Sequence, residues 1–211
     1  MVRAILDGRK TVTRRVIKDF GEDPEKVYPG KCAICVGLFN RSNNMRVTNK
    51  PPYQPGDILY VRETWHKYTK RVGKGEGCHL AEFYGYKASV KDSEDSNEPW
   101  HPSIHMPKEA ARIWLKVTNV RVERLQDITH TQAENEGVGS LFFEDIAFGE
   151  ERYNIPYIQE EGLSRHQFAY LWDSTVKKPD IDRYGWDANP WVWVIEFERC
   201  EKPQEENKNA D

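Results

Sequence analysis

No apolar run in this sequence approaches the roughly 18 residues that a membrane-spanning helix needs, and no signal peptide opens the chain. Cysteine is also scarce, because the 211 residues contain only Cys32, Cys35, Cys78 and Cys200. Four scattered cysteines are too few for a disulfide scaffold of this size. These absences predict a cytoplasmic protein with reduced thiols and no membrane partner.

Several motifs of known site chemistry are missing as well. The sequence has no glycine-rich phosphate loop, no HExxH helix and no nucleophile elbow. Its net charge of −3 argues against broad, non-specific duplex binding, so any contact with nucleic acid should be local. The apolar fraction of 38% is low, but aromatic residues reach 12% and include seven tryptophans. We therefore expect a folded, β-rich core that carries long polar loops.

The first 18 residues predict a short helix, a turn and a strand. Apolar residues recur on one helical face up to Leu6, and Gly8 suits the left-handed end of that helix. Residues 11–17 follow as a β-branched strand. Five basic residues and no acidic one lie between Arg9 and Lys18. Such a cluster suits an anionic partner.

The middle of the chain predicts strands joined by long connections. Residues 19–56 and 91–98 are polar and have no period, so they are expected to be loops. Strands are expected at residues 58–63, 80–88, 112–125 and 189–198. The alternation within 112–125 slips at Thr118–Asn119, which predicts a bulge or a bend of the kind that turns barrel corners.

Two capping boxes predict helices late in the chain. Thr129–Gln132 opens a short helix that stops at Gly137, and Ser164–Gln167 opens a second helix. The second helix carries an apolar stripe of Phe168, Leu171, Trp172 and Val176. Residues 138–162, between the two helices, are acidic and irregular. The order of elements favours an α+β fold: a small mixed β-barrel with short flanking helices and long loop insertions.

Lys10 and Thr13 are the first candidates for chemistry. A threonine hydroxyl is a weak nucleophile, and a neutral lysine amine can serve as its base. Arg14 and Arg15 would lower the pKa of Lys10 by like-charge repulsion. A strict strand would place Lys10 and Thr13 on opposite faces, so the turn after Gly8 must reorient Lys10. The alternative interpretation is an ordinary basic turn at a strand edge.

Glu136 is the third candidate. It lies in the last turn of the helix expected at 129–136, where the helix dipole disfavours an ionised carboxylate by roughly 0.3–1 kcal/mol. That placement suits a general acid near neutral pH. The alternative is an exposed side chain, for which salt makes the effect trivial.

Other side chains are candidates for binding. Glu63 ends the apolar face of strand 58–63, where it either pairs with an arginine inside the barrel or binds a substrate amide edge. Aromatic residues in or near loops either stack on an unpaired base or cover a core, and these are Trp65, Trp100, His105 and Trp186. A weaker candidate is a zinc site formed by Cys32, Cys35, Cys78 and His79.

Several stretches of the sequence carry a family pattern: ILDGRKTVTRR (5–15), QPGDILYVRETW (54–65), IWLKVTNVRVERLQDIT (113–129), AENEG (133–137) and WVWVIEFE (191–198). Together they resemble the ASCH domain family, which has a PUA-like β-barrel fold. The stretches HPSIHMP (101–107) and YGWDANPWVW (184–193) resemble the prophage-borne branch of that family. Family members usually carry a strand ahead of the first helix, and this sequence begins within that helix. The resemblance implies a single domain over residues 1–199, with insertions at about 19–56, 66–108 and 138–162 and a disordered polar tail at 200–211.

The resemblance also implies an activity. Small bacterial members of the family are N(4)-acetylcytidine amidohydrolases, whose catalytic residues are a lysine and a threonine in GRKTxT and a glutamate in AExE. These positions fall on Lys10, Thr13 and Glu136 here. We therefore expect an amidohydrolase that needs no metal and no cofactor and has no obligate protein partner. The expected substrate-binding residues are Arg9, Arg14, Arg15, Glu63, Trp65 and His105.

Two other functions remain open. The first is an RNA- or modified-base-binding module without turnover, in which the basic patch from Arg9 to Arg15 would hold the phosphates of single-stranded RNA. The second, weaker one is a ribonuclease, because some family members resemble one.

Overall fold

The computed structural model describes residues 1–18, 27–29, 36–39, 46–90, 99–138 and 159–204. The loop predicted at 91–98, most of the irregular segment predicted at 138–162 and the end of the predicted tail lie outside these residues. The chain divides into two compact units. The first unit comprises Met1, Arg3–Asp57 and Lys116–Glu198, and the second comprises Val2, Ile58–Leu115 and the chain after Glu198.

Helices and antiparallel strands are mixed along the chain, which confirms the α+β class. The helices are α1 (Val2–Leu6), α2 (His130–Asn135), α3 (Gln159–Thr175) and α4 (Ile181–Tyr184). The strands are β1 (Val12–Val16), β2 (Val27–Pro29), β3 (Val36–Phe39), β4 (Arg46–Asn49), β5 (Ile58–Tyr60), β6 (Trp65–Val72), β7 (His79–Tyr86), β8 (Trp114–Arg124) and β9 (Trp191–Cys200). Among the described residues, no helix is both long and apolar enough to cross a membrane.

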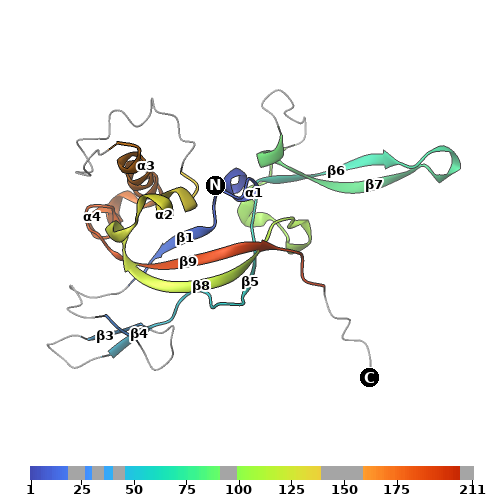
Figure 1. Ribbon diagram of the computed structural model, residues 1–211. Coiled ribbons are helices and arrows are strands. Elements are labelled where there is room, and N and C mark those ends of the chain that lie inside the picture. The colour runs from blue at the N-terminus through green and yellow to red at the C-terminus, as the bar shows by residue number, and fades with distance from the viewer. Residues whose placement is uncertain (19–26, 30–35, 40–45, 91–98, 139–158, 205–211) are drawn as a thin grey trace, which may run out of the picture. The chain divides into compact units, whose positions relative to one another are not determined.

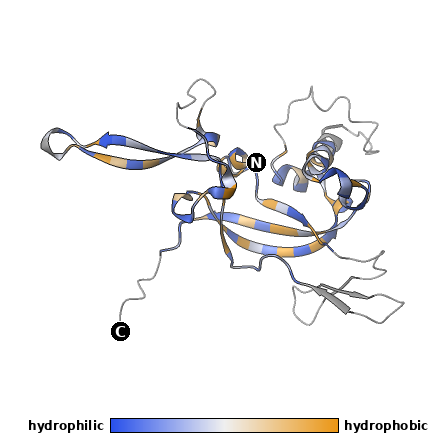
Figure 2. Cartoon of the chain, turned by 180° about the vertical axis from the view of Figure 1, so that it is seen from behind, coloured by the Kyte–Doolittle hydropathy of each residue, from blue (hydrophilic) through white to orange (hydrophobic). Residues whose placement is uncertain are grey.

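A curled sheet with the strand order β1-β9-β8-β5 forms the frame of the fold, and it resembles half of a barrel. β1 runs antiparallel to β9, with Val12 opposite Glu196 and Val16 opposite Val192. β8 and β9 curve together in Figure 1, and hydrophobic and hydrophilic residues alternate along them in Figure 2. Thr118 and Asn119 are both exposed, so the burial pattern of β8 slips where the sequence predicts a bend.

The core of the first unit lies between this sheet and helices α2 and α3. Its buried residues include Val12 of β1, Val192 and Val194 of β9, and Phe168 and Trp172 of α3. The predicted stripe on α3 is confirmed, because its remaining members, Leu171 and Val176, pack against the same core.

The two predicted capping boxes have opposite outcomes. At α2 the box is present: the backbone N–H of Gln132 donates to Thr129 Oγ1 at 3.3 Å, and the Gln132 side chain accepts from the Thr129 N–H at 3.1 Å. The box predicted at Ser164 is wrong, since α3 begins at Gln159 and Ser164 is buried inside it. The preceding Gln-Glu-Glu run favours helix, which extends the helix toward the N-terminus.

Periodicity also missed several short strands. Residues 19–56 do not form one structureless loop, because β2, β3 and β4 pair as an antiparallel sheet within them. Strands of three or four residues are too short to show a period, although each of these contains a valine. The strand predicted at 80–88 is confirmed as β7, but its partner β6 was not expected.

Candidate functional site

The turn after α1 places Lys10 against the end of α2. Gly8 has φ +75°, as its predicted role as a helix stop requires. The backbone N–H of Lys10 then donates to the carbonyl of Ala4 at 2.9 Å. Lys10 also forms an isolated antiparallel bridge with Glu136, which is the C-cap of α2. Residues 126 positions apart in the sequence are thereby held side by side.

Gly137 allows this close approach. Its φ is +86°, and a Cβ atom there would lie 2.8 Å from the Cβ of Ala4 and 3.1 Å from the Cβ of Lys10. Any other residue would push the end of α2 away from the α1–β1 turn. The helix stop predicted at this glycine therefore also packs the two halves of the site together.

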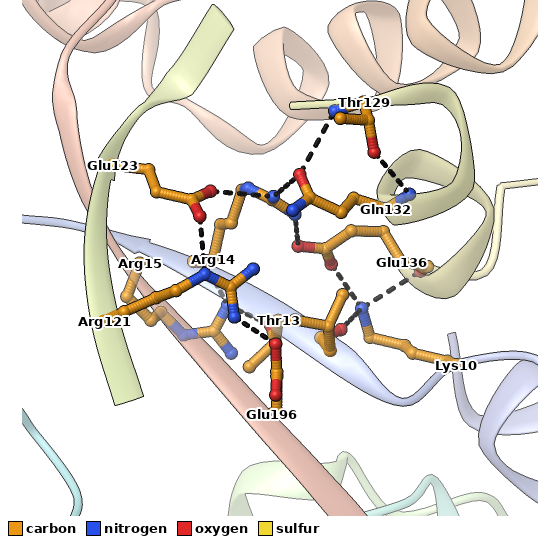
Figure 3. Close-up of polar contacts among 11 residues, drawn as sticks. Lys10, Thr13, Arg14, Arg15, Arg121, Glu123, Thr129, Gln132, Glu136 and Glu196 are labelled. Atoms are coloured by element: carbon orange, nitrogen blue, oxygen red, sulfur yellow. Dashed lines mark hydrogen bonds and ion pairs between the residues drawn. The ribbon is translucent and has the colours of Figure 1, made fainter. Parts of the chain in front are cut away.

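The ammonium group of Lys10 is enclosed by three acceptors. Its Nζ lies 2.6 Å from Glu136 Oε2, 3.0 Å from the Glu136 carbonyl and 2.8 Å from the Val12 carbonyl (Figure 3). Only 4% of the Lys10 side chain and 5% of the Glu136 side chain are exposed. The alternative of an exposed Glu136 side chain is therefore wrong, and Lys10 is not a surface lysine.

Arg14 holds the other oxygen of the same carboxylate. Its Nη1 lies 3.1 Å from Glu136 Oε1, and its Nη2 lies 3.0 Å from Gln132 Oε1 and 3.5 Å from Glu123 Oε2. The Arg14 side chain is fully buried, with its guanidinium 5.7 Å from the ring centre of Phe168. We call Lys10, Arg14 and Glu136 the carboxylate cluster.

Glu123 links the carboxylate cluster to a second ion pair. Arg121 Nε lies 2.5 Å from Glu123 Oε1, and Arg121 also pairs with Glu196 of β9. Figure 3 shows this chain of charges running from Glu136 at the end of α2 through Arg14 of β1 to β8 and β9. The cluster is therefore supported from four elements of the first unit.

Burial lowers the pKa of Lys10 from its ordinary value of 10.5. The Glu136 carboxylate acts in the opposite direction, while Arg15 and Arg14 lower the pKa further, as the sequence predicts. The net effect is a lowered pKa, because removing an ammonium group from water disfavours its charge. A lysine of this kind is closer to serving as a base than a lysine on the surface.

This lowered pKa predicts a dependence of stability on pH. Between the lowered pKa of Lys10 and 10.5, the unfolded chain binds a proton that the folded chain has released. The free energy of unfolding should therefore rise with pH in that window. We expect guanidinium denaturation from pH 8 to 10.5, above the ordinary pKa of the Met1 amino group, to show a steeper rise in the native protein than in Lys10→Met. Parallel curves for the two proteins would contradict the lowered pKa.

Thr13 lies beside the carboxylate cluster but outside it. Its Oγ1 accepts a hydrogen bond from Arg15 Nη1 at 3.1 Å. Among the described residues, the three hydrogen bonds of Lys10 Nζ do not include one to Thr13. The turn therefore orients Lys10 toward Glu136. A hydrogen bond between Lys10 Nζ and Thr13 Oγ1, which a base and its nucleophile would share, is not formed in this structure. Lys10 does bind the carbonyl of the peptide that joins Val12 to Thr13.

A pocket of about 520 Å³ opens over this part of β1. Polar residues of the site contribute to its wall, namely Thr13, Arg14, Arg15 and Glu136. Apolar and aromatic residues form another part: Phe168, Leu171 and Trp172 of α3, Val176 directly after α3, and Tyr184 of α4. Lys18, Lys177 and Asp180 add further charges. The size is within the range of small-molecule sites, roughly 300–1,000 Å³.

The basic stretch at the start of the chain is divided between interior and surface. Arg9 is exposed, and its guanidinium binds Asp7 at 3.1 Å and the Gly137 carbonyl at 3.5 Å. Arg15 is also exposed, whereas Lys10 and Arg14 are buried. An anionic ligand can therefore reach Arg9 and Arg15 directly, whereas the Arg14 guanidinium is buried and donates to the carboxylate of Glu136.

Glu63 belongs to the second unit, where it pairs with an arginine. Its two oxygens accept from Arg112 Nε at 2.9 Å and Arg112 Nη2 at 2.8 Å, and its side chain is 1% exposed. The Arg112 guanidinium also lies 4.0 Å from the ring centre of Tyr86. Hydrogen bonding to Glu63 raises the pKa of Arg112. Of the two interpretations of Glu63, pairing with an arginine is confirmed.

The aromatic candidates have different surroundings. Trp186 is 1% exposed within the core of the first unit, so it covers a core. In the second unit, Trp65 lies 5.0 Å from the His101 ring and 5.7 Å from the Tyr84 ring, and Trp100 lies 4.5 Å from His66. His105 is exposed in a single 3-10 turn, Ser103–His105.

The weaker candidate, a zinc site, is not tested by the structure. Cys32 and Cys35 lie outside the described residues, and Cys78 is exposed. Within the described ranges, no group of three or more histidine, cysteine or acidic residues could hold a metal ion.

Sequence reasoning missed two contributors to the site. Gln132 was expected only as a cap, yet it also binds Arg14. Its spacing of four residues from Glu136 on one helix is the signal that could have found it. The aromatic residues of α3 were expected only as core, although Phe168 and Trp172 also line the pocket.

Comparisons of the chain with protein-family models, with curated proteins and with solved structures find no significant match.

Proposed function

We propose that this protein is an amidohydrolase that removes the acetyl group from N(4)-acetylcytidine or a related acylated cytosine nucleoside. The observation that carries the proposal is the carboxylate cluster, in which a buried lysine of lowered pKa meets a glutamate 2.6 Å away beside a pocket. The sequence resemblance to the ASCH domain family supplies the substrate class. With it we propose that the curled half-barrel sheet is PUA-like.

The short contact between Lys10 and Glu136 provides a way to prepare both an acid and a base. Transfer of one proton from the ammonium to Glu136 Oε2 leaves a neutral amine and a neutral carboxylic acid. The amine can then accept a proton, and the acid can donate one. Arg14 binds the other carboxylate oxygen, Oε1, and leaves Oε2 as the oxygen that faces the amine.

In the proposed reaction, Thr13 Oγ1 attacks the acetyl carbonyl carbon and its proton passes to the amine of Lys10. The bond between the acetyl carbon and the N4 nitrogen then breaks. The nitrogen takes a proton from Glu136, directly or from Lys10 positioned by Glu136, and cytidine leaves. Water hydrolyses the acetyl ester on Thr13, which releases acetate and restores the hydroxyl.

Arg15 supports Thr13 as the nucleophile. A cationic N–H donor on the hydroxyl oxygen stabilises negative charge that develops there, and it leaves the hydroxyl proton free to be given to a base. Lys10 reaches the peptide carbonyl next to Thr13, so a rotation of the lysine or threonine side chain would complete the pair. The aromatic part of the pocket wall suits the planar cytosine ring.

Incubation with N(4)-acetylcytidine, followed by chromatography of cytidine, tests the proposal. We expect cytidine and acetate in equal amounts from the native protein and no product from Lys10→Ala. Failure to form product above the Lys10→Ala level would overturn the amidohydrolase.

Binding without turnover is the second candidate function, favoured by the exposed guanidinium of Arg15 on the pocket wall. Equilibrium dialysis of the same nucleoside separates the two functions, since a binding module would retain the nucleoside unchanged.

A further inference from the structure

Strands β6 and β7 of the second unit form a long two-stranded ribbon. They pair antiparallel over eight residues each, from Trp65 opposite Tyr86 to Val72 opposite His79. Among the described residues these strands make a sheet of their own, without a third strand (Figure 1). A two-stranded sheet is marginally stable in water, so the side chains on its faces need an explanation.

One face of the ribbon carries a ladder of aromatic rings. Side chains alternate along each strand, so His66, Tyr68 and Phe83 share a face. His66 lies 5.4 Å from Tyr68, and Tyr68 lies 5.7 Å from Phe83 with the two rings 28° from parallel. Trp100 extends the ladder, with its ring 4.5 Å from His66.

The absence of a side chain at Gly85 makes room for the ladder. It lies opposite His66, and a Cβ atom on it would be 1.9 Å from His66 Nε2. The histidine ring therefore lies directly over the backbone of the other strand, where only glycine leaves room. That position brings His66 between Trp100 and Tyr68.

The far end of the ladder is open to solvent. Phe83 is 36% exposed and Tyr68 is half-buried, whereas His66 is buried. A cross-strand Tyr–Phe pair stabilises a ribbon, but it does not require one ring to face water. The exposed π-surface is available to a planar partner.

The charge of the ribbon is opposite to that of the whole chain. Residues 65–87 contain five lysines and arginines and two glutamates, whereas the whole chain has a net charge of −3. Glu82 pairs with Lys67 at 2.7 Å. In the part of the chain that the structure describes, no ion pair involves Lys70, and alternation places Lys70 on the aromatic face.

We infer that this aromatic face of the β6–β7 ribbon binds single-stranded nucleic acid. Stacked rings beside a cation match a polymer of planar bases and phosphates, and stacking tolerates any base because each has a π-face. A duplex fits less well, since its bases are already stacked on one another. An acidic peptide would use the charge but not the rings. The inference does not depend on the proposed hydrolase.

Fluorescence anisotropy of labelled single strands of about 12 nucleotides, within the span of known single-strand sites, tests the inference on the full chain. We expect the double variant Tyr68→Leu/Phe83→Leu to weaken binding at least about fivefold, because leucines keep an apolar cross-strand pair but remove the stacking surface. Lys70→Gln should reduce the slope of log affinity against log salt by about 0.7. Lys116→Gln, an exposed lysine on β8, is the matched control and should change neither quantity.

The inference is supported if Tyr68→Leu/Phe83→Leu binds the single strand more weakly and if Lys70→Gln reduces the slope of log affinity against log salt. It is overturned if no RNA or DNA single strand binds, if a duplex of equal length competes equally, or if the ribbon variants bind like the native chain. Thermal unfolding checks that the double variant is folded, and Lys70→Gln leaves the ring packing untouched. N(4)-acetylcytidine hydrolysis should be the same in these variants, so failure of this inference is distinct from failure of the proposed function.

Discussion

Replacing Glu136 with glutamine should lower kcat/KM for N(4)-acetylcytidine by about 10³-fold, the middle of the usual range for loss of a general acid or base. The amide cannot take the Lys10 proton, so the carboxylic acid that would protonate the leaving nitrogen does not form. The stability of the fold should also fall, since each carboxylate oxygen accepts from a buried cation. In glutamine one of those oxygens becomes an NH₂ group, which faces a donor.

Glu134→Gln is the matched control for this prediction. Glu134 lies on the same helix, but its side chain is 51% exposed and its partner is His130 at 3.4 Å. We expect this variant to keep both activity and stability, as surface substitutions usually change stability by less than about 0.5 kcal/mol. Steady-state measurement of kcat/KM for the two variants tests the prediction. Equal rates for Glu136→Gln and Glu134→Gln would exclude Glu136 from the chemistry.

Replacing Arg14 with methionine should lower the free energy of unfolding by about 3–5 kcal/mol, the usual effect of removing one partner from a buried ion pair. The variant leaves Glu136 Oε1 without its donor, removes one of the two donors to Gln132 Oε1 and takes the guanidinium away from the ring of Phe168. Methionine fills much of the space of the side chain, so the loss reports charge pairing more than cavity formation.

The neighbouring Arg15→Met serves as the comparison for Arg14→Met. Arg15 carries the same charge on the same strand, but alternation places it on the exposed side. Its substitution should change the free energy of unfolding by less than about 0.5 kcal/mol. Urea denaturation at pH 7 measures both. A similar, small change in the two variants would show that the buried network contributes little to stability.

Local patterns in the sequence predicted the elements that hold the site. The glycine stop at Gly8, the capping box at Thr129 and the glycine stop at Gly137 are all present, because each depends on a few adjacent residues. The alternation of side chains along β1 likewise places Arg14 on the same side as Val12, and both are buried. These features rest on local sterics and hydrogen bonding, which sequence alone displays.

Long-range pairings could not be predicted from spacing. Lys10 and Glu136 meet because a turn and a helix end pack together, and no period in the sequence reports that. The two readings of Glu63 stayed open for the same reason, since Arg112 is 49 residues away. For Lys10 and Glu136, the resemblance to a family, and not the spacing, predicted that the two residues belong to one site. The short strands β2 to β4 were missed because their length hides any alternation.

The most direct test of the catalytic pair is the initial rate of cytidine formation from N(4)-acetylcytidine by four proteins: native, Lys10→Ala, Glu136→Gln and the double variant. If the two residues act as one unit, each single variant loses about as much rate as the double variant, because removing either partner disables the other. We predict turnover by the native protein and equally low rates for the other three. Cytidine formation by Lys10→Ala at the native rate, or no formation by the native protein, would contradict the account.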